Sequence, residues 1–285
     1  MQADSGRLGT SSLGRPRRTR ISDQETERRM LATAADAVAE AGLAVSLDHI
    51  RLEDVIREAG VSRSAAYRKW PTKDAFLGDL LLELARGQAP MAALGTDEAN
   101  AAIRRILAER LDELDTIEGR RHAVAAVVRE TADQEFRRIT TSPQWRTYLA
   151  LTATFAGLPE GELRDQVGEA LATSERTLTE GVARSHEAVA RLLGLRARVG
   201  IEDIAHLVNA QMRGMVVKAL VQPELTERTS RVSFTGADED WSLAAVGVGA
   251  LVLAFLEPDP DWDAARLREA LRNEEPVLGQ SAAAS

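Results

Sequence analysis

Apolar residues recur at helical spacing along almost the whole chain of 285 residues, whereas the alternation typical of strands is hard to find. Glycine or proline interrupts this pattern at intervals, which divides it into separate helices. The sequence therefore predicts an all-α fold. The expected helices run from a cap at Ser22 or Asp23 to Gly42, then over 52–59, 62–70, 72–86, 97–115, 119–138, 143–156, 160–194, 201–222, 240–257 and 261–273, with a polar loop over 226–239.

Charge divides the chain into two unlike parts. The formal net charge is −8, but residues 1–75 hold 13 Arg and Lys against 11 Asp and Glu, whereas residues 76–285 hold 23 against 33. This asymmetry indicates a basic N-terminal module attached to an acidic body. Residues 1–21 are rich in Gly, Ser and Arg and are expected to form a disordered basic arm.

Composition excludes several classes of protein. The chain has no cysteine, which excludes a disulfide framework, a Cys-ligated metal and a thiol nucleophile. It has four histidines without metal-ligand spacing, so neither a metal nor a cofactor is expected. The longest uncharged apolar run, 243–256, is shorter than the about 20 residues of a membrane span. No signal peptide is evident, so we expect a cytoplasmic protein with no membrane partner.

The most informative segment is LEDVIREAGVSRSAAYRKWPTKDAF, residues 52–76. Gly60 suits a turn that needs a positive φ angle, and Val61 can pack between two helices. Ser62 is a favourable N-cap for the helix that follows. The pattern predicts a helix-turn-helix unit, in which the second helix enters the major groove of DNA.

The second helix of this unit is basic. No acidic residue occurs between Val61 and Thr72, and Arg63 shares a face with Tyr67, as Ser64 does with Arg68. A helix of this kind suits a polyanionic partner. The alternative interpretation is a solvated surface helix of an all-α domain.

The run Ala59-Gly60-Val61-Ser62, followed by Tyr67, Trp70, Lys73 and Phe76, resembles the DNA-binding domain of TetR-family transcriptional regulators. The motif covers about residues 52–77, and the preceding helix extends the likeness to about 24–86. The sequence departs from the family pattern at Ser64, Ala66, Trp70 and Arg51, which usually are Gly, Leu or Ile, Phe and Thr. These departures affect which bases the domain is expected to prefer more than they affect its resemblance to the family.

The resemblance implies a role for each matching position. Ser62, Tyr67, Lys69 and Lys73 would contact phosphates, and Arg51 could reach another phosphate. Arg63 and Ser64, together with Ala65 or Arg68, would face base edges. Trp70 would lie in the core under the recognition helix. Residues 22–87 would then form the DNA-binding domain.

The basic arm precedes this domain directly. Arg17, Arg18 and Arg20 would reach into the adjacent minor groove, as basic arms can. The alternative is a solvated tail that assists solubility.

The resemblance further implies that residues 88–275 form an all-helical regulatory and dimerisation domain, followed by a frayed tail over 276–285. The segments 201–222 and 240–257 are the candidates for the dimer interface, where Gly247 and Gly249 would allow close helix approach. The alternative for both is internal core.

A ligand pocket is harder to assign from the sequence. The candidate lining residues are aromatic or sulfur-containing, with Arg129 or His122 to supply polarity; they are Phe136, Trp145, Tyr148, Phe155 and Met212. Each of these is as readily a plain core residue. His186 and His206 are isolated histidines and are not expected to bind a metal, and no Ser, His and Asp combination indicates catalysis.

The preferred interpretation is a homodimeric transcriptional regulator, a repressor that a small-molecule effector releases from double-stranded operator DNA. It is not expected to be an enzyme. The alternative is a helical small-molecule-binding protein or enzyme that retains a vestigial helix-turn-helix. A nucleoid-type DNA coat is disfavoured, because the body carries a surplus of acids.

Overall fold

A computed structural model describes residues 21–41, 50–87, 96–263, 267 and 269. The predicted all-α class is confirmed. The α-helices in these ranges are α1 (Asp23–Ala41), α2 (Leu52–Glu58), α3 (Arg63–Lys69), α4 (Lys73–Gly87), α5 (Asp97–Glu109), α6 (Ile117–Thr141), α7 (Pro143–Gly157), α8 (Glu162–Leu192), α9 (Ile201–Val221) and α10 (Leu243–Phe255).

Hydroxyl side chains cap many of these helices. The Oγ atom of Ser62 accepts the Ala65 backbone N–H at 3.2 Å, and Thr96, Thr116, Ser142 and Ser242 cap later helices in the same way. Each cap satisfies one of the backbone donors that a helix leaves free at its start. The helix starts therefore follow local sequence chemistry.

Four short strands were not expected. Strand β2 (Thr229–Val232) pairs antiparallel with β3 (Glu239–Ser242), so a hairpin occupies most of the predicted polar loop. Strand β1 (Leu195–Ala197) pairs antiparallel with β4 (Leu256–Pro258), and these two strands are distant from each other in the sequence. Strands of three or four residues leave too short a pattern for periodicity to reveal. Two single 3₁₀ turns, η2 (Leu111–Glu113) and η3 (Pro223–Thr226), complete the described elements.

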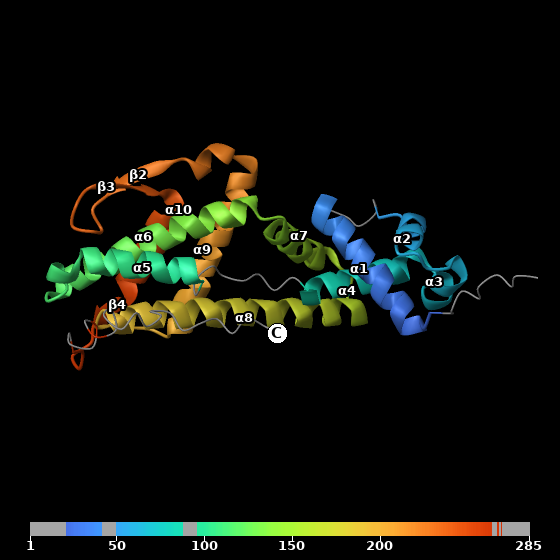
Figure 1. The fold of residues 1–285 in the computed structure, drawn as a ribbon, viewed down its shortest axis with the longest axis horizontal. Helices are drawn as coiled ribbons and strands as arrows, with labels where there is room; N and C mark the ends of the chain where they lie inside the picture. Colours follow the sequence, from blue (N-terminus) through green and yellow to red (C-terminus); the bar gives the residue numbers. More distant parts are fainter. Residues whose placement is uncertain (1–20, 42–49, 88–95, 264–266, 268, 270–285) are drawn as a thin grey trace, which may run out of the picture.

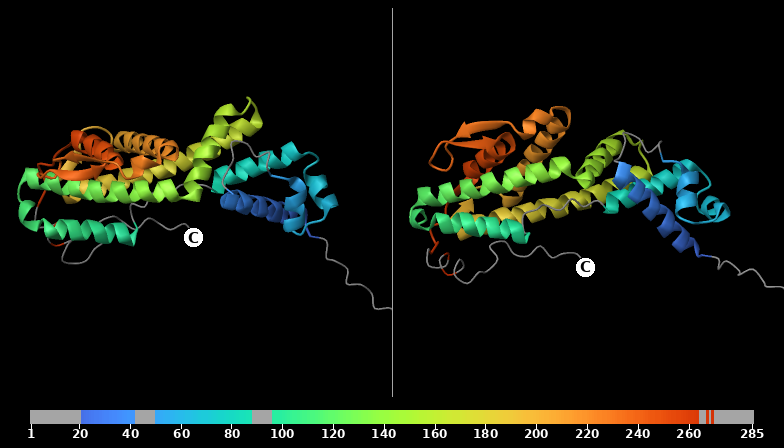
Figure 2. Two further views of the ribbon diagram at one scale, coloured as in Figure 1. Left: turned by 90° about the horizontal axis from the view of Figure 1, so that it is seen from above. Right: turned by 45° about the horizontal axis from the view of Figure 1, so that its top comes forward.

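The molecule is elongated, with two lobes (Figure 1). Helices α1 to α4 gather at one end, and α5, α6, α9 and α10 lie at the other with the β2–β3 hairpin (Figures 1 and 2). Helix α8 runs along most of this length and packs against both α4 and α9. Helix α7 lies between the lobes and contacts α1 and α4. We call α1–α4 the N-terminal lobe and the remainder the body.

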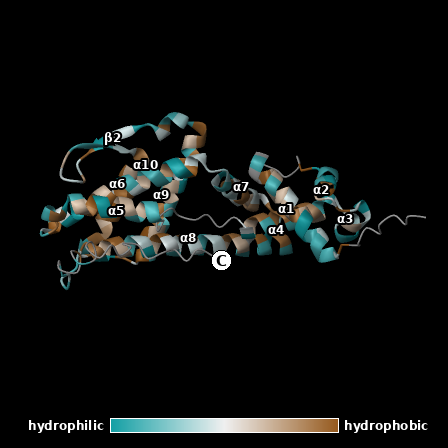
Figure 3. Cartoon of the chain, in the orientation of Figure 1, coloured by the Kyte–Doolittle hydropathy of each residue, from teal (hydrophilic) through white to brown (hydrophobic). Residues whose placement is uncertain are grey.

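Most helices of both lobes carry hydrophilic as well as hydrophobic residues, as Figure 3 shows. In the N-terminal lobe, the fully buried Trp70 and Phe76 meet edge to face with ring centroids 5.1 Å apart. The Trp70 indole N–H donates to Asp79 at 2.8 Å, so its polar atom is satisfied. The predicted core position of Trp70 is confirmed.

Several predicted segments lie outside the described residues. These are the basic arm, the connection that follows Gly42, the frayed tail and most of the helix predicted over 261–273.

Candidate functional site

The turn between α2 and α3 sets the orientation of α3. Gly60 adopts a φ angle of 65°, a value that residues with a Cβ atom rarely take. Val61 is buried behind this turn, and Ala65 and Ala66 form the buried side of α3. Small residues on that side let α3 lie close to the rest of the lobe, which leaves its other side facing solvent.

The solvent-facing side of α3 carries the predicted contact residues. All of them are exposed, and we call this set the α3 face: Ser62, Arg63, Ser64, Tyr67, Arg68 and Lys69. Helix α3 lies at the end of the molecule remote from the β2–β3 hairpin (Figure 1). The body therefore does not obstruct this face within the single chain.

Acidic side chains of neighbouring helices partner the α3 face. Glu53 of α2 holds both Arg63, with a nitrogen–oxygen distance of 3.0 Å, and the Tyr67 hydroxyl, at 2.7 Å. Asp23 of α1 pairs with Arg68, and Glu27 pairs with Lys69. Sequence reasoning missed these acids because they lie outside α3 itself.

These pairs affect ionisation without fixing the side chains firmly. The hydrogen bond to Glu53 raises the pKa of Tyr67, and the hydrogen bond to Glu27 raises the pKa of Lys69. Both groups are ordinarily protonated at neutral pH, and these shifts are in the direction that keeps them so. Exposed ion pairs contribute only about 0–1 kcal/mol each. Phosphate oxygens could therefore replace these carboxylates at small cost.

The remaining predicted contact residues flank α3. Arg51 is exposed and immediately precedes α2, and Lys73 is the first residue of α4. Arg17, Arg18 and Arg20 lie outside the described residues.

The body contains a cavity of about 80 Å³. Its wall comes from α6, α7, α8, α9, α10 and the first residue of β4, and it is mostly aliphatic. The polar side chains on the wall are Thr131, Glu135, Ser185, His186, Asn209 and Arg213. Since one buried water needs about 10–15 Å³ by such a measure, the cavity can take a small organic group.

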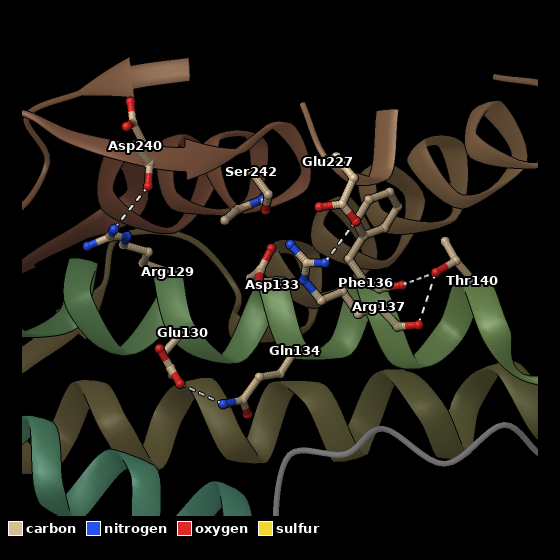
Figure 4. A network of polar contacts seen from close by, with 11 residues as sticks. Arg129, Glu130, Asp133, Gln134, Phe136, Arg137, Thr140, Glu227, Asp240 and Ser242 are labelled. Carbon is tan, nitrogen blue, oxygen red and sulfur yellow. Dashed lines mark hydrogen bonds and ion pairs between the residues drawn. The ribbon is translucent and has the colours of Figure 1, made fainter. Parts of the chain in front are cut away.

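Two of the predicted pocket residues, Trp145 and Met212, lie on this wall. Arg129 does not. It points from α6 to the hairpin, where it pairs with Glu239 at 2.6 Å and donates to the Asp240 carbonyl (Figure 4). The polar role assigned to it in a pocket is therefore corrected to a contact between α6 and the β2–β3 hairpin.

The other predicted pocket residues do not line the cavity either. Phe136 is fully buried on α6, and Tyr148 is fully buried and donates its hydroxyl to Glu175 of α8. Phe155 packs under the Arg164 guanidinium, whose carbon lies 4.7 Å from the ring centre. His122 lies against Gly236 of the hairpin loop. Helical rotation decides which residues face inward, and a list of aromatic residues does not reveal it.

Residues that sequence reasoning did not place in the pocket supply most of its polarity. His186 Nδ1 lies 2.8 Å from the Val182 carbonyl, and burial lowers the pKa of His186. Asn209 donates to Thr179, and Arg213 donates to Glu175 at 2.6 Å. The signal that could have found them is their shared position on the inward sides of α8 and α9.

Among the described residues, no group of three or more His, Cys, Asp and Glu side chains is arranged to bind a metal ion. Within the same ranges, no helix combines the length and apolarity needed to cross a bilayer.

No family model matches the chain. Relatives 25% identical over 190 residues, which make up 66% of this chain and 95% of each relative, are uncharacterised HTH-type transcriptional regulators of Mycobacterium bovis and Mycobacterium tuberculosis. A crystal structure of reduced Escherichia coli NemR aligns with 82% of this chain and 99% of its own, at 14% identity and a TM-score of 0.42. The sequence relatives support a transcriptional regulator of the helix-turn-helix type.

Proposed function

We propose that the chain is a TetR-type, sequence-specific repressor that acts as a homodimer and responds to a small-molecule effector. The observation that carries this proposal is the α3 face. Five exposed polar or basic residues follow a glycine turn and the serine cap Ser62, and no acid interrupts them. The relatives, which are named HTH-type transcriptional regulators, support the DNA-binding part of this proposal.

In this proposal α3 enters the major groove with its N-terminal residues toward the bases. Arg63 and Ser64 lie at that end, so they reach base edges, and Arg68 follows one turn later. Ser62, Tyr67, Lys69 and Lys73 contact phosphates. On binding, the phosphates and bases take over the basic groups that Glu53, Asp23 and Glu27 hold in the free protein.

The proposed dimer rests on an apolar stripe along α9. The stripe consists of exposed residues spaced three and four apart, which places them on one side of the helix: Leu207, Ala210, Gly214, Val217 and Val221. Val221 is 80% exposed and Val217 47% exposed in the single chain. The adjoining helix α10 has no charged residue and exposes Ala250 and Ala254. A second copy of the same surface is the partner that would bury both stripes symmetrically.

The two glycines that the sequence suggested for this interface pack within the chain instead. A Cβ atom on Gly247 would lie 2.2 Å from the Gln211 side chain of α9, and one on Gly249 would lie 3.0 Å from Trp241. They allow α10 to approach α9 and the hairpin. The stripe on α9 therefore carries the dimer proposal.

Gly214→Asp tests the dimer cleanly. A Cβ atom there meets nothing within 4 Å in the single chain, so the variant is expected to fold. A carboxylate in the centre of the stripe would be buried without a partner in the dimer, so we expect monomers by analytical ultracentrifugation. Gly181→Asp is the matched control, because Gly181 is an equally open helical glycine on α8. A dimer that survives Gly214→Asp would contradict this interface.

Effector control is proposed to pass from the cavity to the N-terminal lobe. A ligand can shift operator affinity only through its different affinities for the two dimer geometries. Helix α7 is the element suited to this, since it carries Trp145 on the cavity wall and contacts α1 and α4. An effector would favour a spacing of the two α3 helices that no longer matches successive major grooves, about 34 Å apart.

Selection of bound fragments from genomic DNA, followed by mobility shifts, tests the function. We expect a palindromic site that binds far more tightly than random DNA of the same length. Arg63→Ala should lower this preference, whereas Lys73→Ala should weaken binding to all sequences alike. Equal affinity for selected and random fragments would contradict sequence-specific regulation.

A further inference from the structure

Two buried donors on the wall of the body cavity have no acceptor. They are the indole Nε1 of Trp145 and the guanidinium Nε of Arg213. Trp145 is 5% exposed, so bulk water does not solvate its N–H group. A buried donor without a partner is unfavourable, and a bound molecule that supplies an acceptor is one way to satisfy it.

The two donors belong to one cluster around Tyr148. The Trp145 and Tyr148 rings meet edge to face with centroids 5.8 Å apart. The Arg213 guanidinium carbon lies 5.5 Å from the centre of the same Tyr148 ring. The two unpaired donors of α7 and α9 thus belong to wall residues that share the Tyr148 ring as a neighbour.

The other polar side chains of the wall already have partners. Ser185 donates to the Gly181 carbonyl and Thr131 to the Val127 carbonyl, each along its own helix. His186 and Asn209 contact Val182 and Thr179. The buried side-chain atoms of the described wall that have no hydrogen-bond partner at all are therefore these two donors, which need an acceptor.

The charged side chains of the cavity wall are balanced without a ligand. The Arg213 guanidinium donates a terminal N–H to Glu175 at 2.6 Å, and the Glu135 carboxylate pairs with Arg138 at 2.7 Å. An anionic ligand would enter an apolar cavity without a free cation among these groups, which is unfavourable. An uncharged acceptor meets no such penalty.

We propose that the effector is a compact apolar molecule that bears an uncharged carbonyl oxygen, and that this oxygen accepts from Trp145 Nε1 and Arg213 Nε. Aliphatic side chains from α6, α8 and α10 enclose the apolar part of the molecule. This inference rests on the effector cavity of the proposed function. It does not depend on DNA binding, because the ligand site is complete without the N-terminal lobe.

The position of the donors also indicates how the signal leaves the cavity. Trp145 lies on α7, and α7 packs against α1 and α4 of the N-terminal lobe (Figure 2). A carbonyl oxygen that joins Trp145 to Arg213 links α7 to α9, the helix that carries the proposed dimer stripe. The ligand thus couples the N-terminal lobe to the dimer interface.

A pair of isosteric probes tests the inference in the absence of DNA. Acetophenone has a carbonyl oxygen where α-methylstyrene has a methylene group, and benzoate adds a charge. By titration of the full chain, we expect acetophenone to bind about fivefold or more tightly than α-methylstyrene, as one added hydrogen bond implies. Benzoate should bind more weakly than acetophenone.

A nitrogen-15 spectrum identifies the donor directly. The chain has four tryptophans, and Trp145→Phe identifies the indole signal of Trp145 by its loss. Acetophenone should move that proton signal downfield, and α-methylstyrene should not. In Trp145→Phe the preference for acetophenone should fall, whereas Trp262→Phe is a control, since its indole already donates to the Leu192 carbonyl.

Equal affinity of the two isosteric probes, an unmoved Trp145 signal, or no binding of either probe would overturn the inference. The affinity ratio of the two probes is measured on the wild-type protein alone. This test of the inference therefore holds even if a variant fails to fold. A protein that prefers acetophenone but binds no operator would contradict the proposed function and leave the ligand site intact. A protein that binds its operator but does not prefer acetophenone would contradict the ligand site only.

Discussion

The α3 face and the body cavity differ in how their polar groups are satisfied. On the α3 face every basic residue is exposed, and carboxylates of α1 and α2 hold Arg63, Arg68 and Lys69. In the cavity the polar groups are few, and Trp145 and Arg213 keep buried donors without acceptors. The basic residues of the α3 face have carboxylate partners that another anion can replace. Two donors of the cavity wall have no acceptor at all.

The contrast has a physical consequence for recognition. Exposed ion pairs are weak and screened by salt, so a polyanion can exchange them and leave again. A buried donor cannot be satisfied by solvent, so it selects a molecule with an acceptor at one position. The α3 face therefore suits a long charged partner, and the cavity suits a small apolar one.

The largest expected effect is a difference in the free energy of unfolding between substitutions on the buried and exposed sides of α3. Trp70→Ala should destabilise the N-terminal lobe by about 3–5 kcal/mol, because it removes a fully buried ring packed on Phe76. Tyr67→Ala, on the α3 face, should cost about 1 kcal/mol or less. Urea denaturation followed by circular dichroism measures both. Similar losses would show that the α3 face is part of the core.

Arg63→Ala tests whether the α3 face reads sequence. We expect it to reduce discrimination between the selected operator and a single-base variant by about 1–3 kcal/mol, measured by competition binding. Arg176→Ala, on α8 of the body, serves as the control. A uniform loss of affinity for every sequence would assign Arg63 to phosphate contact instead.

His186 tests the burial of the cavity wall. Burial lowers the pKa of His186 below the ordinary 6.5. Below pH 6.5 the unfolded chain therefore binds a proton at His186 that the folded chain does not bind. The contribution of neutral His186 to the free energy of unfolding is therefore fully present above pH 6.5. It falls as the pH drops through that value, by up to about 1.4 kcal/mol per pH unit.

Thermal unfolding between pH 7.5 and 5.5 measures this loss. His186→Leu should remove the His186 contribution. His206→Gln, which alters an exposed histidine of α9, should retain it. An unchanged pH dependence in His186→Leu would show that other groups cause the loss.

The smallest expected effect concerns Glu53. Glu53→Gln removes a negative charge that holds Arg63 and keeps an amide oxygen for the Tyr67 hydroxyl. DNA affinity should rise a few-fold at low salt and much less at high salt, as exposed pairs contribute about 1 kcal/mol at most. Glu58→Gln is the matched control, since Glu58 on the same helix pairs with Arg57. Weaker binding by Glu53→Gln would show that Glu53 orients Arg63 for DNA.

The helix-turn-helix was predictable because its signals are local. Gly60 has the positive φ angle that its place in the motif requires, and Ser62 caps α3 through the atom expected of a serine N-cap. The buried Trp70 and the exposed Tyr67 follow from helical spacing around one short helix. Such features depend on neighbours within a few residues.

The hairpin and the cavity were not predictable in this way. Strands β1 and β4 pair across about 60 residues of chain, and a segment of three residues carries no pattern of its own. Arg129 and Tyr148 look like pocket residues by type, yet they contact the β2–β3 hairpin and Glu175. Their direction depends on the rotation of α6 and α7 within the body.

The sequence by itself thus determined the helical class, the basic helix α3 and the division of charge between the two parts of the chain, because these follow from local spacing and composition. Tertiary packing alone decided which carboxylates partner the α3 face and which donors remain unpaired in the cavity. The physical reason is distance along the chain: Glu53 reaches Tyr67 from another helix, and Trp145 of α7 and Arg213 of α9 each contact the Tyr148 ring only in the folded body.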